Sequence, residues 1–433
     1  MFSEKELKKI AGLTIERMKI GRKPNFGIEL AKRKFGEKFV ERLLKQKWVV
    51  PRDEKERKIF DKLEDPDYGP LLIKRGKRYW VKKKVGETVR IVHSINEEIE
   101  RLVDFLKEEI WKRGCHVLDL RYSSQEERKS LKLKPWDTIA ELPLSTKFLA
   151  KSINTRIFIG GLEDIFWAKG LEWKLKFSAK VSQKLREIID RRKVKWLVFG
   201  WPIEKKQYLV DEGKYKKVFY AAIKETFKPS IQKYCKYYEK SLWGADRIKI
   251  VAADGTNLTF RIKGRPLLKA DGKIDENDLK KGDVGVNIPD GEVYVAPLEH
   301  SANGYIKFDW VPIEGFGLVR DLKIKFKNGK IVWFDSPDRK IFKRFLSANT
   351  GEKDRIAEFG IGTNLKAEPI GETIVDEKIF GSIHIAIGNN QGTYHGKNRA
   401  SCHLDMVKLM KEVDGRIYVD NKLIMQAGLP LKD

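Results

Sequence analysis

The chain has 433 residues, of which 41% are hydrophobic and 35% are charged, and its formal net charge at pH 7 is +27. This length exceeds that of one typical apolar core, so two or three domains are expected. The three cysteines, Cys115, Cys235 and Cys402, lie far apart without CxxC spacing, which argues against a disulfide framework, a zinc ribbon or an iron-sulfur cluster and favours the cytoplasm. No apolar run approaches the ~20 residues of a membrane span, and the amino terminus does not resemble a secretory signal.

Residues 1–85 are strongly basic, with 26 Lys and Arg against 13 Asp and Glu. Apolar residues three and four positions apart predict short helices within residues 2–20, 25–35 and 36–46. The segment GPLLIKRGKRYWVKKKV, residues 69–85, alternates around a Lys-Arg-Gly turn, which predicts a basic hairpin. We therefore expect residues 1–85 to form a separate basic module of helices followed by a hairpin. This order of elements is compatible with a winged-helix-like topology.

Residues 86–245 show strands that alternate with helices. TVRIVHSI is typical of a strand, and the amphipathic pattern that follows it predicts a helix that ends at Gly114. HVLDLRYS, TRIFIGG and KWLVFGWP repeat the strand pattern along this part of the chain. Such alternation predicts an α/β domain with a mostly parallel sheet.

Residues 246–433 are rich in Gly and dominated by strand patterns such as DRIKIVAADGTNLTFRIKG and LVRDLKIKFKNGKIVWFD. One helix is expected near residues 339–349. The sequence therefore predicts an α/β domain joined to a mainly β carboxyl-terminal domain.

Three strands of the β-rich part place a histidine or a carboxylate on their polar face. In GSIHIAIG the isoleucines share one face, while His384 lies among small residues on the other. His403 and Asp405 of SCHLDMV share a face, and Glu292 of GEVYVAP lies opposite two valines. Taken singly, each is most simply a solvated or hydrogen-bonded structural residue. Together they form the set of imidazole and carboxylate ligands that zinc, cobalt and manganese prefer.

Several segments resemble the thermophilic metallo-aminopeptidase family that includes aminopeptidase T and aminopeptidase S. These are, in chain order, IVAADGTNLTFRIKGR, DVGVNIPDGEVYVAP, AEFGIGTNLKA, VDEKIFGSIHIAIGNN and SCHLDMV. A weaker likeness in TRIFIGGLED and KYKKVFYAAIKETF extends the resemblance over residues 86–433, whereas residues 1–85 have no counterpart. The resemblance implies a metallo-aminopeptidase that acts on peptides and forms a homodimer.

The resemblance also implies a site with two divalent metal ions, zinc, cobalt or manganese. The implied ligands are Glu292, Glu358, Glu377, His384, His403 and Asp405. Glu358 corresponds to the carboxylate that bridges the two ions. Ions held in this way clamp the terminal amine and the carbonyl oxygen of a substrate and activate a water for attack on the first peptide bond.

One position departs from the family pattern. Family members have a Tyr seven residues after the first His, where it stabilises the tetrahedral intermediate, but this chain has Gln391. Tyr394 and His395 follow closely, and either is a candidate oxyanion donor, although Tyr394 also fits an ordinary loop aromatic. Of the remaining histidines, His300 has two interpretations: it holds a ligand carboxylate in place, or it is an ordinary residue of a surface loop.

A different class of function is open for residues 1–85. In KRGKRYWVKKK, basic residues surround Tyr79 and Trp80, a mixture of charge and stacking rings that is typical of nucleic-acid binding. In a Lys-rich chain of thermophile-like composition, however, a basic hairpin is usually a solvated face. The alternative function is thus a nucleic-acid-binding protein that acts through the basic amino-terminal module, with the peptidase-like domain either degenerate or serving as a binding module.

Overall fold

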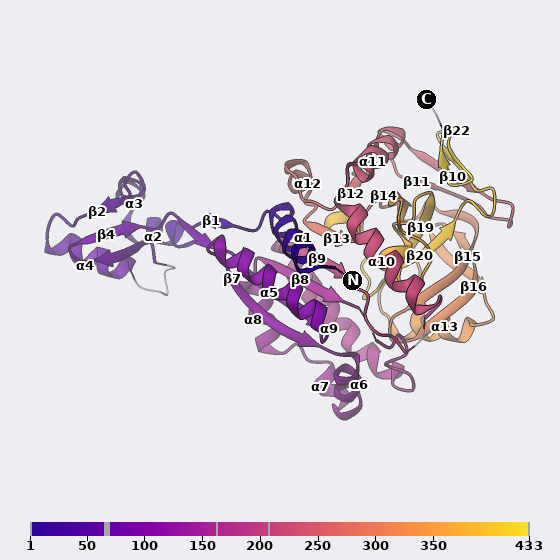
Figure 1. Ribbon diagram of the computed structural model, residues 1–433, viewed down its shortest axis with the longest axis horizontal. Coiled ribbons are helices and arrows are strands. Elements are labelled where there is room, and N and C mark those ends of the chain that lie inside the picture. Colours follow the sequence, from indigo (N-terminus) through magenta and orange to yellow (C-terminus); the bar gives the residue numbers. More distant parts are fainter. Residues whose placement is uncertain (1, 65–69, 162, 207, 432–433) are drawn as a thin grey trace.

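The computed structural model describes residues 2–64, 70–161, 163–206 and 208–431 (Figure 1). Within these residues the chain forms a mixed α/β protein with five sheets. The expected mixture of α/β and β-rich parts is therefore confirmed. No helix in these residues has the length and apolar character needed to cross a membrane.

A parallel sheet with the strand order β13-β9-β8-β6-β7 forms the centre of the α/β part. Its strands are β6 (Thr88–Ser94), β7 (His116–Tyr122), β8 (Thr155–Gly160), β9 (Lys195–Gly200) and β13 (Gly285–Ile288). The helices of this part are α5 (Glu97–Lys112), α6 (Ser124–Leu133), α7 (Trp136–Ile139), α8 (Leu144–Ser152), α9 (Glu172–Arg191) and α10 (Glu212–Thr226). The next helix, α11 (Pro229–Leu242), buries its apolar residues in the core of the β-rich part instead. Helix α5 begins after its N-cap Asn96 and buries Leu102, Leu106 and Ile110 at helical spacing.

Helix α1 (Glu4–Arg17) packs against α5 rather than against the rest of the basic segment. Its residues Leu7, Ile10 and Ile15 are buried in the apolar core of the parallel sheet. The apolar stripe of α1 needs a partner, and α5 supplies a matching one. The expected module of residues 1–85 is therefore divided, and its first helix belongs to the α/β core.

Residues 22–64 and 70–86 form a small unit that projects from the rest of the protein (Figure 1). Its elements are β1 (Arg22–Pro24), α2 (Gly27–Phe35), α3 (Glu37–Leu44), β2 (Trp48–Val49), α4 (Glu54–Leu63), β3 (Leu72–Arg75), β4 (Arg78–Val81) and β5 (Lys84–Gly86). We call this unit the basic module. β1 pairs with β5, and a separate sheet has the order β2-β4-β3. The predicted hairpin is β3–β4, whose turn contains Gly76 at a φ of 66°. A winged-helix-like topology remains a prediction.

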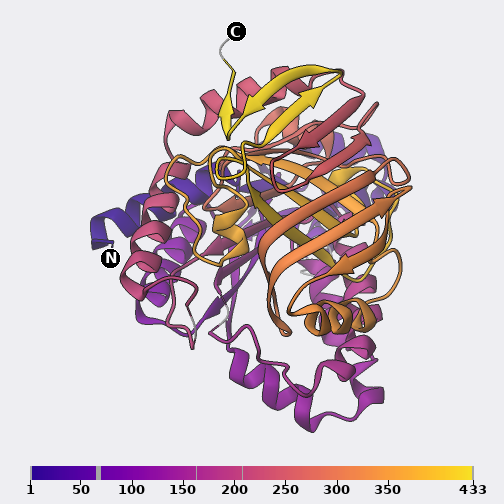
Figure 2. The ribbon, with the colours of Figure 1, turned by 90° about the vertical axis from the view of Figure 1, so that its right-hand side faces the viewer.

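Two antiparallel sheets make up the β-rich part, and the strands β15 and β16 cross the front of Figure 2 in orange. The first sheet has the order β17-β16-β15-β11-β10-β21-β22-β23, and the second has the order β12-β14-β18-β19-β20. Strands of the first sheet are β10 (Arg247–Val251), β11 (Asn257–Arg261), β15 (Asn303–Ile313), β16 (Gly317–Lys327), β17 (Lys330–Asp335), β21 (Arg416–Val419), β22 (Lys422–Gln426) and β23 (Leu429–Pro430). Strands of the second sheet are β12 (Leu268–Ala270), β14 (Glu292–Val295), β18 (Ile356–Gly362), β19 (Ser382–Gly388) and β20 (His403–Leu409). Apolar side chains from both sheets form one core.

The helix expected near residues 339–349 is α13 (Arg339–Ala348). Three short helical turns, α12 (Glu276–Lys281), α14 (Thr373–Asp376) and η2 (Gly392–Tyr394), lie in loops of this part. Some segments that follow residue 245 pack with the α/β part. β13 joins the parallel sheet, and Val375 and Ile379 are buried in the core of that sheet. The division at residue 245 remains a prediction, and these segments cross it.

Candidate metal centre

One face of the sheet β12-β14-β18-β19-β20 carries five of the predicted ligands. The other face is buried in the apolar core through residues such as Val293, Ile361 and Ile385. Because neighbouring side chains alternate across a strand, the residues between these point to the opposite face. That face presents Glu292 of β14, Glu358 of β18, His384 of β19, and His403 and Asp405 of β20.

Small residues lie beside these ligands on neighbouring strands. The register pairs Gly360 with His384, Ala386 with both Glu358 and Asp405, and Gly388 with His403. The absence of bulky neighbours at these three positions leaves the space into which the longer side chains extend.

Replacing Gly360 with Ala tests this arrangement. A Cβ atom at Gly360 would lie 2.1 Å from both Cε1 and Nε2 of His384, so the imidazole would have to move. We expect Gly360→Ala to weaken zinc binding about tenfold or more, as measured by titration of metal-stripped protein. In the control Gly12→Ala, no atom lies within 4 Å of the added Cβ, and zinc affinity should not change. Wild-type affinity in Gly360→Ala would show that the imidazole position does not matter.

The ligands form two groups that share Glu358. Glu292, Glu358 and His384 form the first group, and Glu358, His403 and Asp405 form the second, with ligand atoms in each group within 4.8 Å of one another. His384 Nε2 lies 3.5 Å from Glu292 Oε2 and 3.3 Å from Glu358 Oε1. His403 Nε2 lies 3.0 Å from Glu358 Oε2 and 3.4 Å from Asp405 Oδ1. The two oxygens of Glu358 therefore face different groups.

These groups fit divalent cations. Oε2 of Glu292 and Oδ1 of Asp405 are buried without a hydrogen-bond partner, which is costly unless a ligand binds them. Nδ1 of His403 donates a hydrogen bond to the backbone carbonyl of Asn389 at 2.7 Å. This bond directs Nε2 of the same ring towards the carboxylates, as is usual for histidines that bind metals. Nitrogen and oxygen ligands of this kind suit zinc, cobalt and manganese.

The electrostatics of the cluster also favour a bound positive charge. Burial by itself lowers the pKa of His384, but the carboxylates of Glu358 and Glu292 raise it to about 9. Burial likewise opposes the charge of His403, whose pKa Asp405 and Glu358 raise well above its usual value. Burial raises the pKa of Glu358, but hydrogen bonds from both histidines bring it well below its usual value. Without a cation, protons on the imidazoles balance the carboxylates.

Glu377, the sixth predicted ligand, contacts Lys378 at the edge of this cluster. Nζ of Lys378 lies 2.8 Å from Glu377 Oε1 and 2.6 Å from Glu292 Oε1, and the lysine is fully buried. Glu377 is not in either ligand group. Burial raises its pKa to about 8, although Lys378 acts in the opposite direction. Lys378 could not be predicted as part of the site, because only its place beside Glu377 distinguishes it in the sequence from the chain's many other lysines.

The turn η2 brings Tyr394 to the cluster. Its ring stacks on the His403 ring with 5.1 Å between centroids, and its hydroxyl lies 3.5 Å from His403 Nε2. Burial and the nearby carboxylate of Glu358 raise the pKa of Tyr394 well above its usual value, so the hydroxyl keeps its proton. His395 instead bonds to the backbone carbonyl of Lys281. Of the two candidates that follow Gln391, Tyr394 is therefore the one at the site.

The other histidines and the cysteines are not members of the two ligand groups. His300 is exposed and bonds to Arg355, and buried His93 contacts Asp119 at 3.2 Å. Cys402 is buried in the apolar core, where burial raises its pKa to about 11. These three residues therefore have structural surroundings.

A cavity of about 490 Å³ opens beside His403 and Asp405. Tyr122 and Phe158, near the carboxyl ends of β7 and β8, line one side of it, and residues 371–374 line another. The crevice at the carboxyl ends of parallel strands is the usual ligand site of such sheets. The cavity therefore offers space for a substrate next to the ligand groups.

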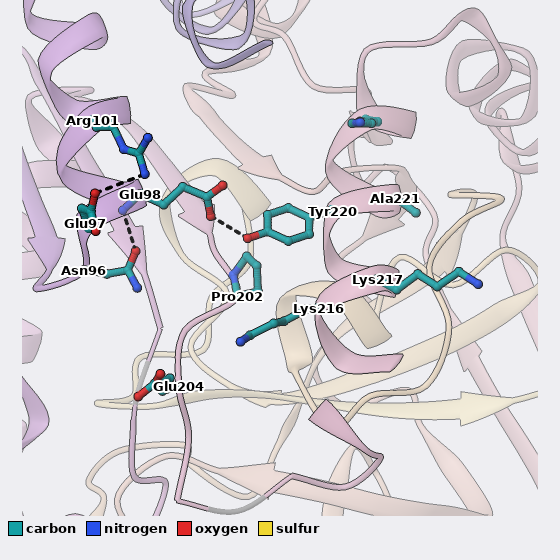
Figure 3. Close-up of a pocket in the computed structure, with 11 residues that line it drawn as sticks. Asn96, Glu97, Glu98, Arg101, Pro202, Glu204, Lys216, Lys217, Tyr220 and Ala221 are labelled. Atoms are coloured by element: carbon teal, nitrogen blue, oxygen red, sulfur yellow. Dashed lines mark hydrogen bonds and ion pairs between the residues drawn. The ribbon is translucent and has the colours of Figure 1, made fainter. Parts of the chain in front are cut away.

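A second cavity, of about 720 Å³, lies around the amino-terminal end of α5 (Figure 3). Some of its polar groups bind one another: Tyr220 donates a hydrogen bond to Glu98, and Arg101 pairs with Glu97. Glu98 also accepts a hydrogen bond from Trp201. These pairs belong to the packing of α5, whereas the predicted ligand groups lie on the sheet β12-β14-β18-β19-β20, where we place the functional site.

Comparison with known proteins gives one family and several similar folds. A family model described as thermophilic metalloprotease (M29) matches residues 67–428, starting earlier than the expected residue 86. The structure is similar to that of wild-type AmpT from Thermus thermophilus, with a TM-score of 0.62 and 17% identity over 80% of this chain and 95% of that chain. It is also similar to 2,5-dihydroxypyridine dioxygenase from Pseudomonas putida, with a TM-score of 0.50 and 14% identity over 80% of this chain and 92% of that chain. No curated protein sequence matches the chain.

The names of these two proteins indicate different chemistry although their structures are similar to this one, so the fold alone does not identify the reaction. The family model does, because it covers most of the chain, including all six predicted ligands. The presence of two groups of carboxylate and imidazole ligands agrees with it. The chain therefore belongs to the thermophilic metalloprotease family (M29), and it is a metal-dependent hydrolase.

Proposed function

We propose that this enzyme is an aminopeptidase with a dinuclear metal centre. The observation that supports two ions is the position of Glu358, whose two oxygens face different ligand groups. A shared carboxylate is suited to two ions that lie ~3.5–4 Å apart. The resemblance of the ligand-bearing segments to aminopeptidases T and S supports release of amino-terminal residues.

Each ligand group would hold one ion, with Glu377 as an additional ligand at the edge. Bound zinc, cobalt or manganese would polarise a peptide carbonyl and lower the pKa of a water. Lys378 holds the carboxylates of Glu292 and Glu377 in place through its ion pairs. The cavity beside His403 would accept the end of the peptide.

We assign Tyr394 the role of hydrogen-bond donor to the substrate carbonyl oxygen. Its hydroxyl is protonated and lies beside the second ligand group. A donor at this place stabilises negative charge as it develops on that oxygen.

Tyr394→Phe should lower kcat about a hundredfold while the zinc content stays at the wild-type level, because only the hydroxyl is removed. Steady-state kinetics and elemental analysis of the same preparation would test this. Tyr305→Phe, in β15 of the other sheet, is the matched control and should retain kcat. An unchanged kcat in Tyr394→Phe would remove the residue from the mechanism.

The proposed activity is tested with an amino-acid chromogenic amide and its amino-acetylated counterpart. Metal-stripped protein should be inactive. Added zinc, cobalt or manganese should restore cleavage of the amide that has a free amine but not cleavage of the acetylated one. Metal binding without cleavage would favour a degenerate binding module. Equal cleavage of both amides would contradict amino-terminal specificity.

We also propose that the protein is a cytoplasmic homodimer. Its three cysteines are buried and unpaired, which suits a reducing compartment. Exposed apolar side chains gather on the helices α6 to α9, and they are Leu133, Trp136, Leu144, Phe148 and Trp173. Such a surface is typical of a contact between chains. Sedimentation that shows a monomer would contradict the dimer.

A further inference from the structure

The sheet β2-β4-β3 of the basic module presents two tryptophans on its outer face. Trp48 and Trp80 are direct cross-strand partners, and Ile73 pairs with Trp80 on the other side. The alternate residues Val49 and Tyr79 belong to the apolar core that this sheet shares with the helices of the module. Because side chains alternate along a strand, the two partly exposed tryptophans point away from the helices.

Positive charge surrounds the tryptophan pair. Arg75 and Arg78 are cross-strand partners on the same face, and the guanidinium carbon of Arg78 lies 5.4 Å from the centroid of the Trp48 ring. Lys47 and Lys77 are exposed next to these strands. Among the residues that the structure describes, neither arginine has a carboxylate partner. We call Trp48, Ile73, Arg75, Arg78 and Trp80 the tryptophan face.

The helices α2, α3 and α4 of the same module carry a smaller excess of positive charge, with nine Lys and Arg against six Asp and Glu. Arg42 pairs with Glu56, and Arg57 pairs with Glu54. Residues 70–86, by contrast, contain seven Lys and Arg and neither Asp nor Glu. The module is therefore not uniformly basic. Its larger excess of positive charge lies in the segment of β3, β4 and β5, where the rings are exposed.

We propose that the tryptophan face binds single-stranded nucleic acid, with bases stacked on Trp48 and Trp80 and phosphates at Arg75 and Arg78. Base faces are accessible only in single strands, because in a duplex the bases stack on one another. An acidic peptide would neutralise the arginines but would leave the ring pair unused. The face lies outside the metal-binding sheet, so this function is additional to peptide hydrolysis and does not depend on it.

The test titrates full-length protein with a short labelled oligouridylate and oligothymidylate, followed by fluorescence anisotropy. Trp48→Ala and Trp80→Ala should each raise Kd about tenfold. Combined Arg75→Gln and Arg78→Gln should weaken binding and reduce its dependence on salt. The arginine variants change exposed side chains only, so they test the face without disturbing its core. Trp243→Ala, at a side chain that is 74% exposed on the body of the protein, and Arg57→Gln are the matched controls and should bind as the wild type does.

Binding of either oligonucleotide that these variants weaken supports the proposal. Equal affinity for a duplex of the same length would overturn it, as would wild-type affinity in both the tryptophan and the arginine variants. Binding only to polyglutamate or to phosphatidylserine vesicles would assign the face to an acidic protein or a membrane surface instead. Peptide cleavage, measured in the same preparations, should be unchanged in all of these variants.

Discussion

Glu358→Gln is expected to lower peptide cleavage by more than about a hundredfold and to reduce the amount of bound zinc. Substitution of residues that only support metal ligands costs about 10–100-fold, and Glu358 faces both ligand groups directly. Glutamine keeps the shape of the side chain but removes its negative charge. Each ligand group would then lose the negative charge that Glu358 contributes to it, so both ions should bind more weakly.

The matched control for this substitution is Glu87→Gln. Glu87 is also buried and pairs with Lys195 at 3.0 Å, but it lies by the parallel sheet. Glu87→Gln should therefore lower the stability of the protein without changing zinc content or activity per folded molecule. If Glu358→Gln kept its activity, or if both variants lost activity equally, Glu358 would have no special place at the centre.

Lys378→Met is expected to destabilise the metal-free protein by about 3–5 kcal/mol. Removing one partner of a buried ion pair leaves an uncompensated charge, and Lys378 contacts the carboxylates of both Glu292 and Glu377. Zinc should recover part of this loss, because a cation bound by Glu292 compensates the same negative charge. Urea unfolding with a chelator and with zinc measures both effects.

Lys195→Met provides the comparison for a buried lysine away from the ligands. It breaks the pair with Glu87, so a loss of stability is expected that zinc does not reduce. A loss in Lys378→Met that is equally insensitive to zinc would separate this lysine from metal binding. Unchanged stability would show that its ion pairs are unimportant.

The faces of the ligand-bearing strands could be predicted from the sequence. Their side chains alternate with a period of two, so local order fixes which residues accompany His384 or Glu292 on one face. The resemblance then indicated which faces meet. In the structure these strands are neighbours in one sheet, so their polar faces form one surface. On this surface the small residues Gly360 and Ala386 pair with the longer side chains of His384, Glu358 and Asp405.

Features that depend on contacts between distant segments could not be predicted in this way. The apolar stripe of α1 is visible in the sequence, but its partner α5 is not, so the sequence alone places residues 2–20 in one unit with the rest of residues 1–85. β13 is a short strand that gains its place only by pairing with β9. The choice between Tyr394 and His395 likewise depends on the turn η2, which points one towards His403 and the other towards Lys281.

Anomalous X-ray diffraction from zinc-loaded crystals would locate the bound ions. We expect two zinc peaks on either side of the Glu358 carboxylate, one beside Glu292 and His384 and the other beside His403 and Asp405. A single peak at this position would contradict the dinuclear centre. Zinc bound elsewhere, with the face of this sheet empty, would contradict the site itself.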